Sequence, residues 1–209
     1  MRAILHERSF PVGNIRFFAS ARSAGTTLEW AGRDVVVEDT ATADWAGIGI
    51  ALLSAGRTAS MEYAPKIVAA GATVIDNSSG WRMDPDVPLV VPEVNPDAVA
   101  GYRKRGIIAN PNCSTIQLVT ALKPLHDLSP IKRVVVATYQ STSGGGKAPM
   151  DELFNQTRGI FTNQPVQKSQ ENFTKQIAFN VIPHIDVFMD DGSTKEEWKI
   201  VAETRKILD

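Results

Sequence analysis

The sequence predicts an α/β fold, in which helices cover the faces of a parallel sheet. Short apolar segments alternate with segments of helical periodicity in the first half of the chain, which is the pattern of parallel β-α units. Small and polar residues follow several predicted strands, and parallel sheets bind ligands beyond the carboxyl ends of their strands. Near Cys113 the alternation gives way to one long predicted strand and looser segments, so we expect a domain boundary there.

The composition is that of a globular chain and argues against several classes of partner. Of 209 residues, 43% are hydrophobic and 22% are charged, and the net charge of -1 gives no reason to expect nucleic acid or an anionic membrane. No apolar run approaches the roughly 20 residues of a membrane helix, and the start does not read as a signal peptide. One cysteine forbids an internal disulfide and suits the cytoplasm. Three scattered histidines do not make a metal site.

The first elements are justified by their apolar patterns and their breakers. We expect helices over residues 1–8 and 61–70, and strands over residues 14–20, 34–37, 45–54 and 72–76. Gly71 ends the second helix. The segment 45–54 is almost continuously apolar, as a strand buried on both faces should be.

Three of these strands are followed by residues that suit a ligand. The sequences are SARSAG from Ser20, SAG from Ser54 and NSSGWR from Asn77. Small residues allow a ligand to approach the backbone, and the guanidinium groups of Arg22 and Arg82 are suited to bidentate contact with a phosphate. Turns favour the same residues, but three such segments at successive strand ends favour a ligand-binding edge.

The stretch around Cys113 is the centre of the prediction. A short strand over 106–109 ends at Asn110, and Ser114 and Gln117 have the spacing of a capping box for the helix that follows. Cys113 would then lie just before a helix N-terminus, where the dipole favours a thiolate. Both a nucleophile and a buried structural thiol remain open from position alone.

The second half contains one strong strand signal and two helices. Residues 88–94 suit a sheet edge, and the β-branched run 131–139 predicts a strand that delivers Gln140 and a glycine triplet. Residues 149–158 predict a helix, and 159–176 a long excursion or a partner-binding arm.

The last helix is expected from Lys195 onward. Ser193 or Thr194 is the expected cap, with Glu196 or Glu197 near the third helical position. Its expected inner side consists of Trp198, Val201 and Ile207. Glu196 and Lys199 share one face, and by itself this spacing favours a solvated pair.

Several motifs resemble the aspartate-semialdehyde dehydrogenase family. They are PNCSTIQ around Cys113, TYQSTSGGGK, PLVVPEVN, KEEWKIVAETRKIL, SARSAG, SAG and EYAPK, and they cover nearly the whole chain. The resemblance implies an incomplete Rossmann-like parallel-sheet domain over 1–112, which binds NADP, and an α+β catalytic and dimerisation domain over 113–209. It also implies a homodimer or homotetramer and reductive dephosphorylation of aspartyl phosphate to aspartate semialdehyde, a step in lysine, threonine, methionine, isoleucine and diaminopimelate synthesis.

The resemblance assigns roles to individual residues. Cys113 resembles the nucleophile that forms an acyl-thioester, and Gln140 the glutamine that positions the substrate. The residues that resemble the phosphate and substrate contacts are Arg82, Asn112, Lys199 and Glu196. Those that resemble the cofactor contacts are Arg22, Ser23, Ser54, Gly56, Ser143 and Gly144. In this light the pair of Glu196 and Lys199 serves the site rather than only the helix.

The chain also departs from the family pattern. The glycine-rich loop and first strand are expected upstream of Met1, and a substrate-binding arginine and an acid/base histidine beyond Asp209. His184 does not match the histidine motif, and Arg57 stands where a small residue is expected. We therefore expect little activity from residues 1–209 alone. The alternatives are a related N-acyl-glutamyl-phosphate reductase and a non-catalytic remnant that dimerises.

Overall fold

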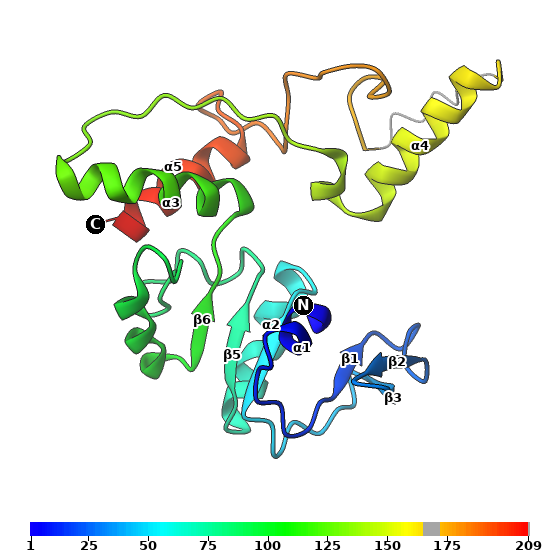
Figure 1. Cartoon of the computed structure of the whole chain (residues 1–209), viewed down its shortest axis with the longest axis vertical. Coiled ribbons are helices and arrows are strands. Elements are labelled where there is room, and N and C mark those ends of the chain that lie inside the picture. The colour runs from blue at the N-terminus through cyan, green and yellow to red at the C-terminus, as the bar shows by residue number, and fades with distance from the viewer. Residues whose placement is uncertain (165–171, 209) are drawn as a thin grey trace.

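The computed structural model describes residues 1–164 and 172–208, and Figure 1 shows it as two parts joined near the end of β6. The strands are β1 (Phe17–Ala19), β2 (Thr27–Trp30), β3 (Arg33–Asp39), β4 (Ile50–Leu53), β5 (Thr73–Asp76) and β6 (Ile107–Ala109). The helices are α1 (Arg2–Glu7), α2 (Arg57–Ala69), α3 (Cys113–Leu128), α4 (Lys147–Phe161) and α5 (Lys195–Leu208), with 3-10 turns η1 (Pro96–Lys104) and η2 (Thr142–Gly145). In the described residues no helix is long and apolar enough to cross a membrane.

Within residues 1–164 and 172–208 the strands form two sheets of three strands each. One sheet has the order β4-β5-β6 and is parallel throughout, with Ala51 opposite Val74 and Val74 opposite Ile107. Leu89 adds a parallel bridge to Ala109, so the extended edge segment predicted over 88–94 is confirmed around Leu89, whereas residues 92–94 form a turn. This is the parallel sheet that the alternating pattern predicts.

The other sheet has the order β1-β3-β2. Strand β1 runs parallel to β3, whereas β2 runs antiparallel to it. Strand β2 was not predicted from the sequence, because its residues TLEW alternate between exposed and half-buried without a strong apolar signal. In the described residues β1 and β4 therefore belong to different sheets, and their carboxyl ends do not form one continuous sheet edge.

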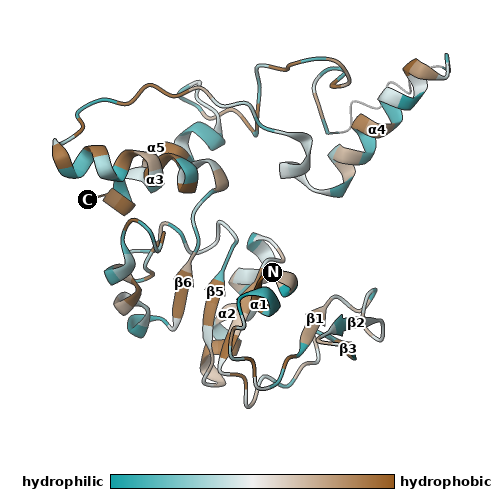
Figure 2. Ribbon diagram, viewed as in Figure 1, coloured by the Kyte–Doolittle hydropathy of each residue, from teal (hydrophilic) through white to brown (hydrophobic). Residues whose placement is uncertain are grey.

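The hydrophobic core lies around the β4-β5-β6 sheet. Side chains of α2, β5, β6 and the segment 81–94 fill it, and Val119 of α3 and Ile207 of α5 extend it. Figure 2 shows β5 and β6 as hydrophobic ribbons. Burying such side chains contributes about 1.5–3 kcal/mol each, so this sheet is the rigid base of the molecule.

Strand β4 is an edge of its sheet and is less buried than predicted. Ile50 and Leu52 are 53% and 41% exposed, so the expectation of a strand buried on both faces over 45–54 is wrong. Residues before Ile50 form turns rather than strand. In the described part of the chain β4 has a pairing partner on one side only, namely β5.

Helices α3 and α5 pack against each other above the sheet, as Figure 1 shows. The buried stripe of α5 contains Glu196, Ile200, Glu203 and Ile207. The predicted inner side is therefore right at Ile207 and wrong at Trp198 and Val201, which are exposed. The hydrophobic pattern misleads here because two carboxylates, rather than apolar groups, face inward.

The predicted strand over 131–139 is wrong. The segment forms neither strand nor helix, and Val135 and Tyr139 are 82% and 88% exposed. A strand exists only where a neighbour completes its hydrogen-bond ladder, and none of the described residues pairs with this segment.

Helix α4 extends away from the rest of the molecule in Figure 1. It confirms the helix predicted over 149–158 and is longer at both ends. Part of the predicted excursion 159–176 lies outside the described residues, at 165–171. The described part returns to α4, where Glu152 accepts hydrogen bonds from the Asn172 backbone and side chain at 3.0 and 2.9 Å.

Candidate functional site

Cys113 is the first residue of α3 and is exposed. The helix is capped by Asn112, whose Oδ1 accepts hydrogen bonds from the backbone N–H groups of Ser114 and Thr115 at 2.9 and 3.4 Å. The predicted capping box of Ser114 and Gln117 is therefore wrong by two residues. Gln117 instead donates to the Cys113 carbonyl at 3.2 Å. The Asn112 side chain satisfies these two N–H groups, and Cys113 lies within the first helical turn.

A polar network surrounds Cys113 and joins three elements. Asn112 Nδ2 donates to Glu196 Oε1 at 2.9 Å, and Gln140 Nε2 lies 3.4 Å from the same oxygen. Gln140 also donates to Ser114 Oγ at 3.1 Å. The structure thus brings together the predicted residues Asn112, Glu196 and Gln140 at the start of α3.

Lys199 lies one turn along α5 from Glu196. Its Nζ contacts Glu196 Oε2 at 3.1 Å and Asp186 Oδ2 at 2.7 Å. Desolvation is the largest single influence on both Asp186 and Lys199 and opposes their ionisation, but their hydrogen bonds and the neighbouring opposite charges together outweigh it. The contact lowers the pKa of Asp186 and, together with Glu196, raises the pKa of Lys199. Both groups therefore stay charged at neutral pH, and the pair is more than the solvated contact that spacing alone favours.

Arg82 is buried beneath the Asn112 turn. Its Nη1 contacts Glu203 Oε1 at 3.1 Å, and its Nε and Nη2 donate to the carbonyls of Asn110 and Asn77 at 2.9 and 3.2 Å. A guanidinium has five N–H donors, so these contacts leave one on each terminal nitrogen. Arg82 is thus a fixed fork with two remaining donors.

The segment after Gln140 forms a hollow beside the thiol. Cys113, Gln140, Ser143 and Gly144 all line it. Ser143 Oγ lies 2.5 Å from Ser141 Oγ within the turn η2. The predicted residues Ser143 and Gly144 therefore share a hollow with the predicted nucleophile.

The four remaining candidates stand at two separate strand ends. Arg22 and Ser23 lie in the turn after β1, with Arg22 exposed and the Ser23 N–H donating to the Ser20 carbonyl at 2.8 Å. Ser54 and Gly56 follow β4, and Ser54 Oγ accepts a long hydrogen bond from Asn77 at 3.4 Å. The ends of β4 and β5 thus meet, whereas Arg22 and Ser23 belong to the other sheet.

Three residues of the network were not predicted. Glu203 is buried and holds Arg82, Asp186 holds Lys199, and Ser114 holds Gln140. Glu203 had a readable signal, because it stands seven residues after Glu196 and so shares its helix face. Asp186 and Ser114 meet their partners through tertiary contacts that the spacing does not reveal.

The histidines lie in contacts unrelated to this network. His6 and His184 lie beside Trp30 and Phe188, and His126 Nδ1 accepts a hydrogen bond from the Ile131 N–H at 3.2 Å. Arg57, the unexpected residue after SAG, begins α2 and donates to the Ser79 carbonyl at 3.3 Å. In the described residues no group of His, Cys, Asp and Glu suits a metal ion.

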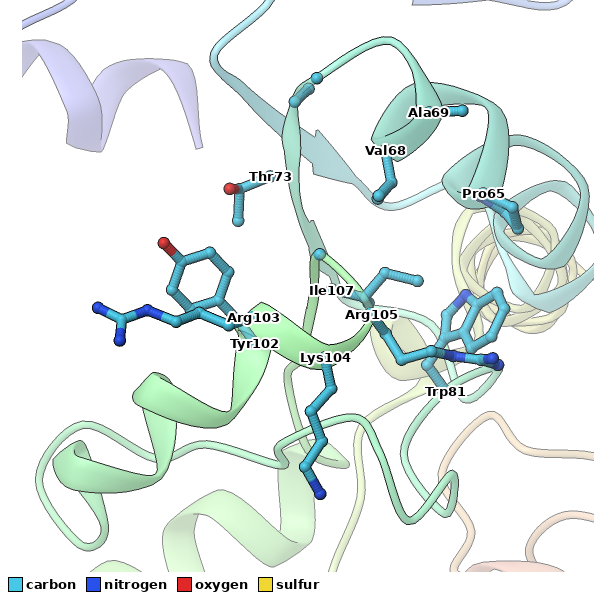
Figure 3. Close-up of a pocket in the computed structure, with 13 residues that line it drawn as sticks. Pro65, Val68, Ala69, Thr73, Trp81, Tyr102, Arg103, Lys104, Arg105 and Ile107 are labelled. Atoms are coloured by element: carbon cyan, nitrogen blue, oxygen red, sulfur yellow. The ribbon is translucent and has the colours of Figure 1, made fainter.

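A second hollow lies at the amino ends of β5 and β6, the opposite edge from Cys113. Thr73, Tyr102 and Ile107 line it, and Figure 3 shows Arg105 against the ring of Trp81. The Arg105 guanidinium lies 5.4 Å from the ring centroid and also pairs with Asp84 at 2.9 Å. Because Arg105 already contacts Trp81 and Asp84, this hollow has fewer groups available to bind a ligand than the site at Cys113.

Two family models match the chain. Residues 1–102 match "Semialdehyde dehydrogenase, NAD binding domain", and residues 122–209 match "Semialdehyde dehydrogenase, dimerisation domain". The curated aspartate-semialdehyde dehydrogenase of Aquifex aeolicus is 54% identical over 206 residues, which are 98% of this chain and 60% of that protein. The chain therefore spans about three fifths of this relative's length.

Solved structures give the same result. The Vibrio cholerae aspartate semialdehyde dehydrogenase II, described as complexed with ASA, is similar with a TM-score of 0.95 and 51% identity over 99% of this chain and 61% of that one. A Candida albicans aspartate semialdehyde dehydrogenase with NADP has a TM-score of 0.64 and 25% identity over 99% of this chain and 56% of that one. Taken together, the matched models, the sequence identities and the shared fold show that this chain belongs to the aspartate-semialdehyde dehydrogenase family.

Proposed function

We propose that this chain carries the acyl-transfer chemistry of an NADPH-dependent aspartate-semialdehyde dehydrogenase. The reaction converts L-aspartyl 4-phosphate to L-aspartate 4-semialdehyde and phosphate. The observation that carries the proposal is the convergence of an exposed thiol, an amide, a carboxylate and two cations around one helix start. Family membership and the similarity to relatives of this name support it.

The first step would be thiolate attack by Cys113 on the acyl carbon of the substrate. A carbon–sulfur bond forms, the carbon–oxygen bond to phosphate breaks, and inorganic phosphate leaves. The helix N-terminus favours the thiolate before attack. Gln140, held by Ser114 and Glu196, would orient the substrate beside the sulfur.

The charged groups would hold the two ends of the substrate. Arg82 and Lys199 would bind the phosphate, with Asn112 as a further donor, because guanidinium and ammonium groups suit phosphate oxygens. Glu196 would receive the substrate amine. Its Oε1 accepts from Asn112 and its Oε2 from Lys199, so the carboxylate is fixed in place.

Several residues fit a nicotinamide cofactor. Gly56 has a φ of +86°, with no heavy atom within 4 Å of where a Cβ would stand, so the backbone is open to a ligand. Arg22 is exposed, and with Ser23 it suits the additional phosphate of NADP. Ser54 would contact the cofactor beside Gly56, and Ser143 and Gly144 would contact its nicotinamide end. A bound NADPH would supply the hydride that reduces the thioester. The carbon–sulfur bond would then break, which releases the semialdehyde and returns Cys113 to the thiolate.

We further propose the assembly and setting of the protein. Residues 1–112 would form the NADP-binding part, and residues 113–209 the catalytic part, which also forms a homodimer or homotetramer. The name of the second matched model, a dimerisation domain, supports self-association. The single cysteine suits a cytoplasmic location.

Turnover by residues 1–209 alone should be low. Loss of an acid/base group typically costs roughly 10²–10⁴-fold in rate, and among the described residues no histidine joins the network around Cys113. A non-catalytic dimerising remnant is the second candidate, because the segment 131–139 is extended and unpaired in the described part of the chain. A remnant would associate in sedimentation without binding NADPH.

The experiment is the rate of Cys113 alkylation with and without phosphate and NADPH. We expect phosphate to slow alkylation in proportion to its occupancy, and NADPH to slow it further. The Cys113→Ser variant, which has no thiol, is the control for alkylation at other side chains. An alkylation rate that neither ligand changes would contradict the proposal and favour the remnant, and a substrate panel would separate the aspartyl enzyme from a glutamyl-phosphate reductase.

A further inference from the structure

The last two turns of α5 hold the loop that carries Arg82. Lys206 Nζ donates to the carbonyls of Arg82, Asp84 and Val87 at 2.8, 2.7 and 2.9 Å. One ammonium thus satisfies three backbone acceptors of a single loop. Burial lowers the pKa of Lys206 from its ordinary value, so keeping this charge half-buried is costly and its carbonyl contacts offset that cost.

Glu203, one turn earlier on α5, connects the same loop to the start of α3. Its Oε1 contacts Arg82 Nη1 at 3.1 Å, and its Oε2 accepts the Asn112 backbone N–H at 2.6 Å. The Glu203 side chain is 2% exposed. One buried carboxylate therefore fixes the distance between the Arg82 guanidinium and the residue that immediately precedes Cys113.

These contacts leave Arg82 little freedom. Two of its nitrogens donate to the carbonyls of Asn110 and Asn77, and a third meets Glu203. Burial and bonding of this kind hold a side chain in one rotamer, which is what a precise anion site requires. A carboxylate that only neutralised Arg82 would not also need the Asn112 amide.

We propose that Glu203 and Lys206 are positioning residues, which together form a clasp that sets Arg82 relative to Cys113 for binding of the substrate phosphate. The proposal rests on the function proposed above. Neither residue touches the substrate. Glu203 acts through the Arg82 side chain and the Asn112 turn, and Lys206 acts through the backbone of the Arg82 loop.

The test compares Glu203→Gln with Glu203→Asp and Lys206→Met, and uses Arg205→Gln as the control. Arg205 is exposed on the same helix, and its substitution by glutamine also removes one charge. The first readout is the phosphate concentration that halves the rate of Cys113 alkylation. We expect it to rise about tenfold or more in Glu203→Gln, because Arg82 and the Asn112 turn lose the buried carboxylate that fixes their relative position. The rise should be smaller in Glu203→Asp, which keeps a carboxylate.

Lys206→Met should raise the same half-protecting concentration several-fold, and Arg205→Gln should leave it unchanged. A residue with only a stabilising role would lower the urea midpoint without moving the half-protecting phosphate concentration of the folded protein. Lys206→Met keeps the test decisive if Glu203→Gln does not fold. An unchanged half-protecting concentration in the folded variants overturns the clasp.

The second readout does not depend on phosphate. The Asn112 amide should exchange with deuterium about tenfold faster or more in Glu203→Gln, because it loses a charged acceptor, while amides of β5 keep their wild-type rates. If phosphate does not slow alkylation of Cys113 in the wild-type chain, the proposed function fails. The exchange rate of the Asn112 amide then decides by itself whether Glu203 holds the Asn112 turn. Equal Asn112 exchange in wild type and Glu203→Gln overturns the clasp.

Discussion

The sheet β4-β5-β6 and the segment 131–139 are rich in the same β-branched residues but differ in burial. Val74 in β5 is fully buried between two parallel neighbours, whereas Val135 is 82% exposed. Strand propensity expresses how well a residue fits a pleated, half-buried surface. The comparison teaches that partners, rather than β-branched residues alone, decide which segment becomes a strand.

The sharpest way to test this contrast is a pair of matched truncations. Leu89→Ala should lower the free energy of unfolding by about 2–5 kcal/mol, because Leu89 is buried in the core. Val135→Ala should change it by no more than about 0.5 kcal/mol, as exposed positions do. Urea unfolding measures both. Equal losses would mean that 131–139 is packed in solution and would break the comparison.

The region around α4 is held by buried polar groups, so its disruption should be local. Gln156 Oε1 accepts the N–H groups of Ile177 and Ala178 at 2.9 and 3.0 Å. Gln156→Ala should cost about 1–3 kcal/mol of local stability and speed deuterium exchange at those two amides. Asn155→Ala, at an exposed position on α4, is the control. Exchange that rises equally in β5 would show that the two regions unfold together.

The sequence allows either Ser193 or Thr194 as the cap of α5, and the structure shows that Thr194 is the cap. Thr194 Oγ1 accepts a hydrogen bond from the Glu197 N–H at 3.3 Å, and Glu197 Oε2 accepts one from the Thr194 N–H at 2.6 Å. Thr194→Ala should cost about 1 kcal/mol, and Ser193→Ala less. Thermal unfolding would measure the difference, and a larger loss at Ser193 would contradict the observed cap.

The smallest expected effect is the acid sensitivity of the pair Asp186 and Lys199. Desolvation raises the pKa of Asp186, but the hydrogen bonds from Lys199 and the Val187 N–H and the charges of Lys199 and Lys195 together lower it below its ordinary 3.8. A lowered carboxylate pKa stabilises the fold above the unfolded value, and that stability is lost as pH falls through the folded value. Asp186→Asn should therefore lower the free energy of unfolding by about 1 kcal/mol or less at pH 7. It should also reduce the further fall of that free energy below about pH 4. An unchanged acid profile of unfolding would contradict this.

The sequence predicted those features that depend on local pattern. The parallel strands around Val74 and Ile107, the helix after Cys113 and the pairing of Glu196 with Lys199 all follow from periodicity and spacing. Features that depend on a distant partner were missed. Strand β2 needs β3 beside it, and Glu203 is buried because Arg82 lies opposite.

Two wrong predictions have a common physical reason. Asn112, and not Ser114, caps α3, because its side-chain oxygen reaches the free N–H groups of the first turn. The buried face of α5 contains the carboxylates Glu196 and Glu203, because amide and guanidinium groups lie opposite them. In both places polar contacts outweigh the hydrophobic pattern. Such departures from local rules are expected at functional sites.

The most direct measurement is acyl transfer to Cys113, followed by intact mass after addition of L-aspartyl 4-phosphate without cofactor. The site predicts one aspartyl group per chain, carried on Cys113 and absent in Cys113→Ser, with phosphate released in equal amount. No adduct on a folded chain whose Cys113 alkylates readily would contradict the account, because the thiol would then be reactive but not placed for an acyl phosphate.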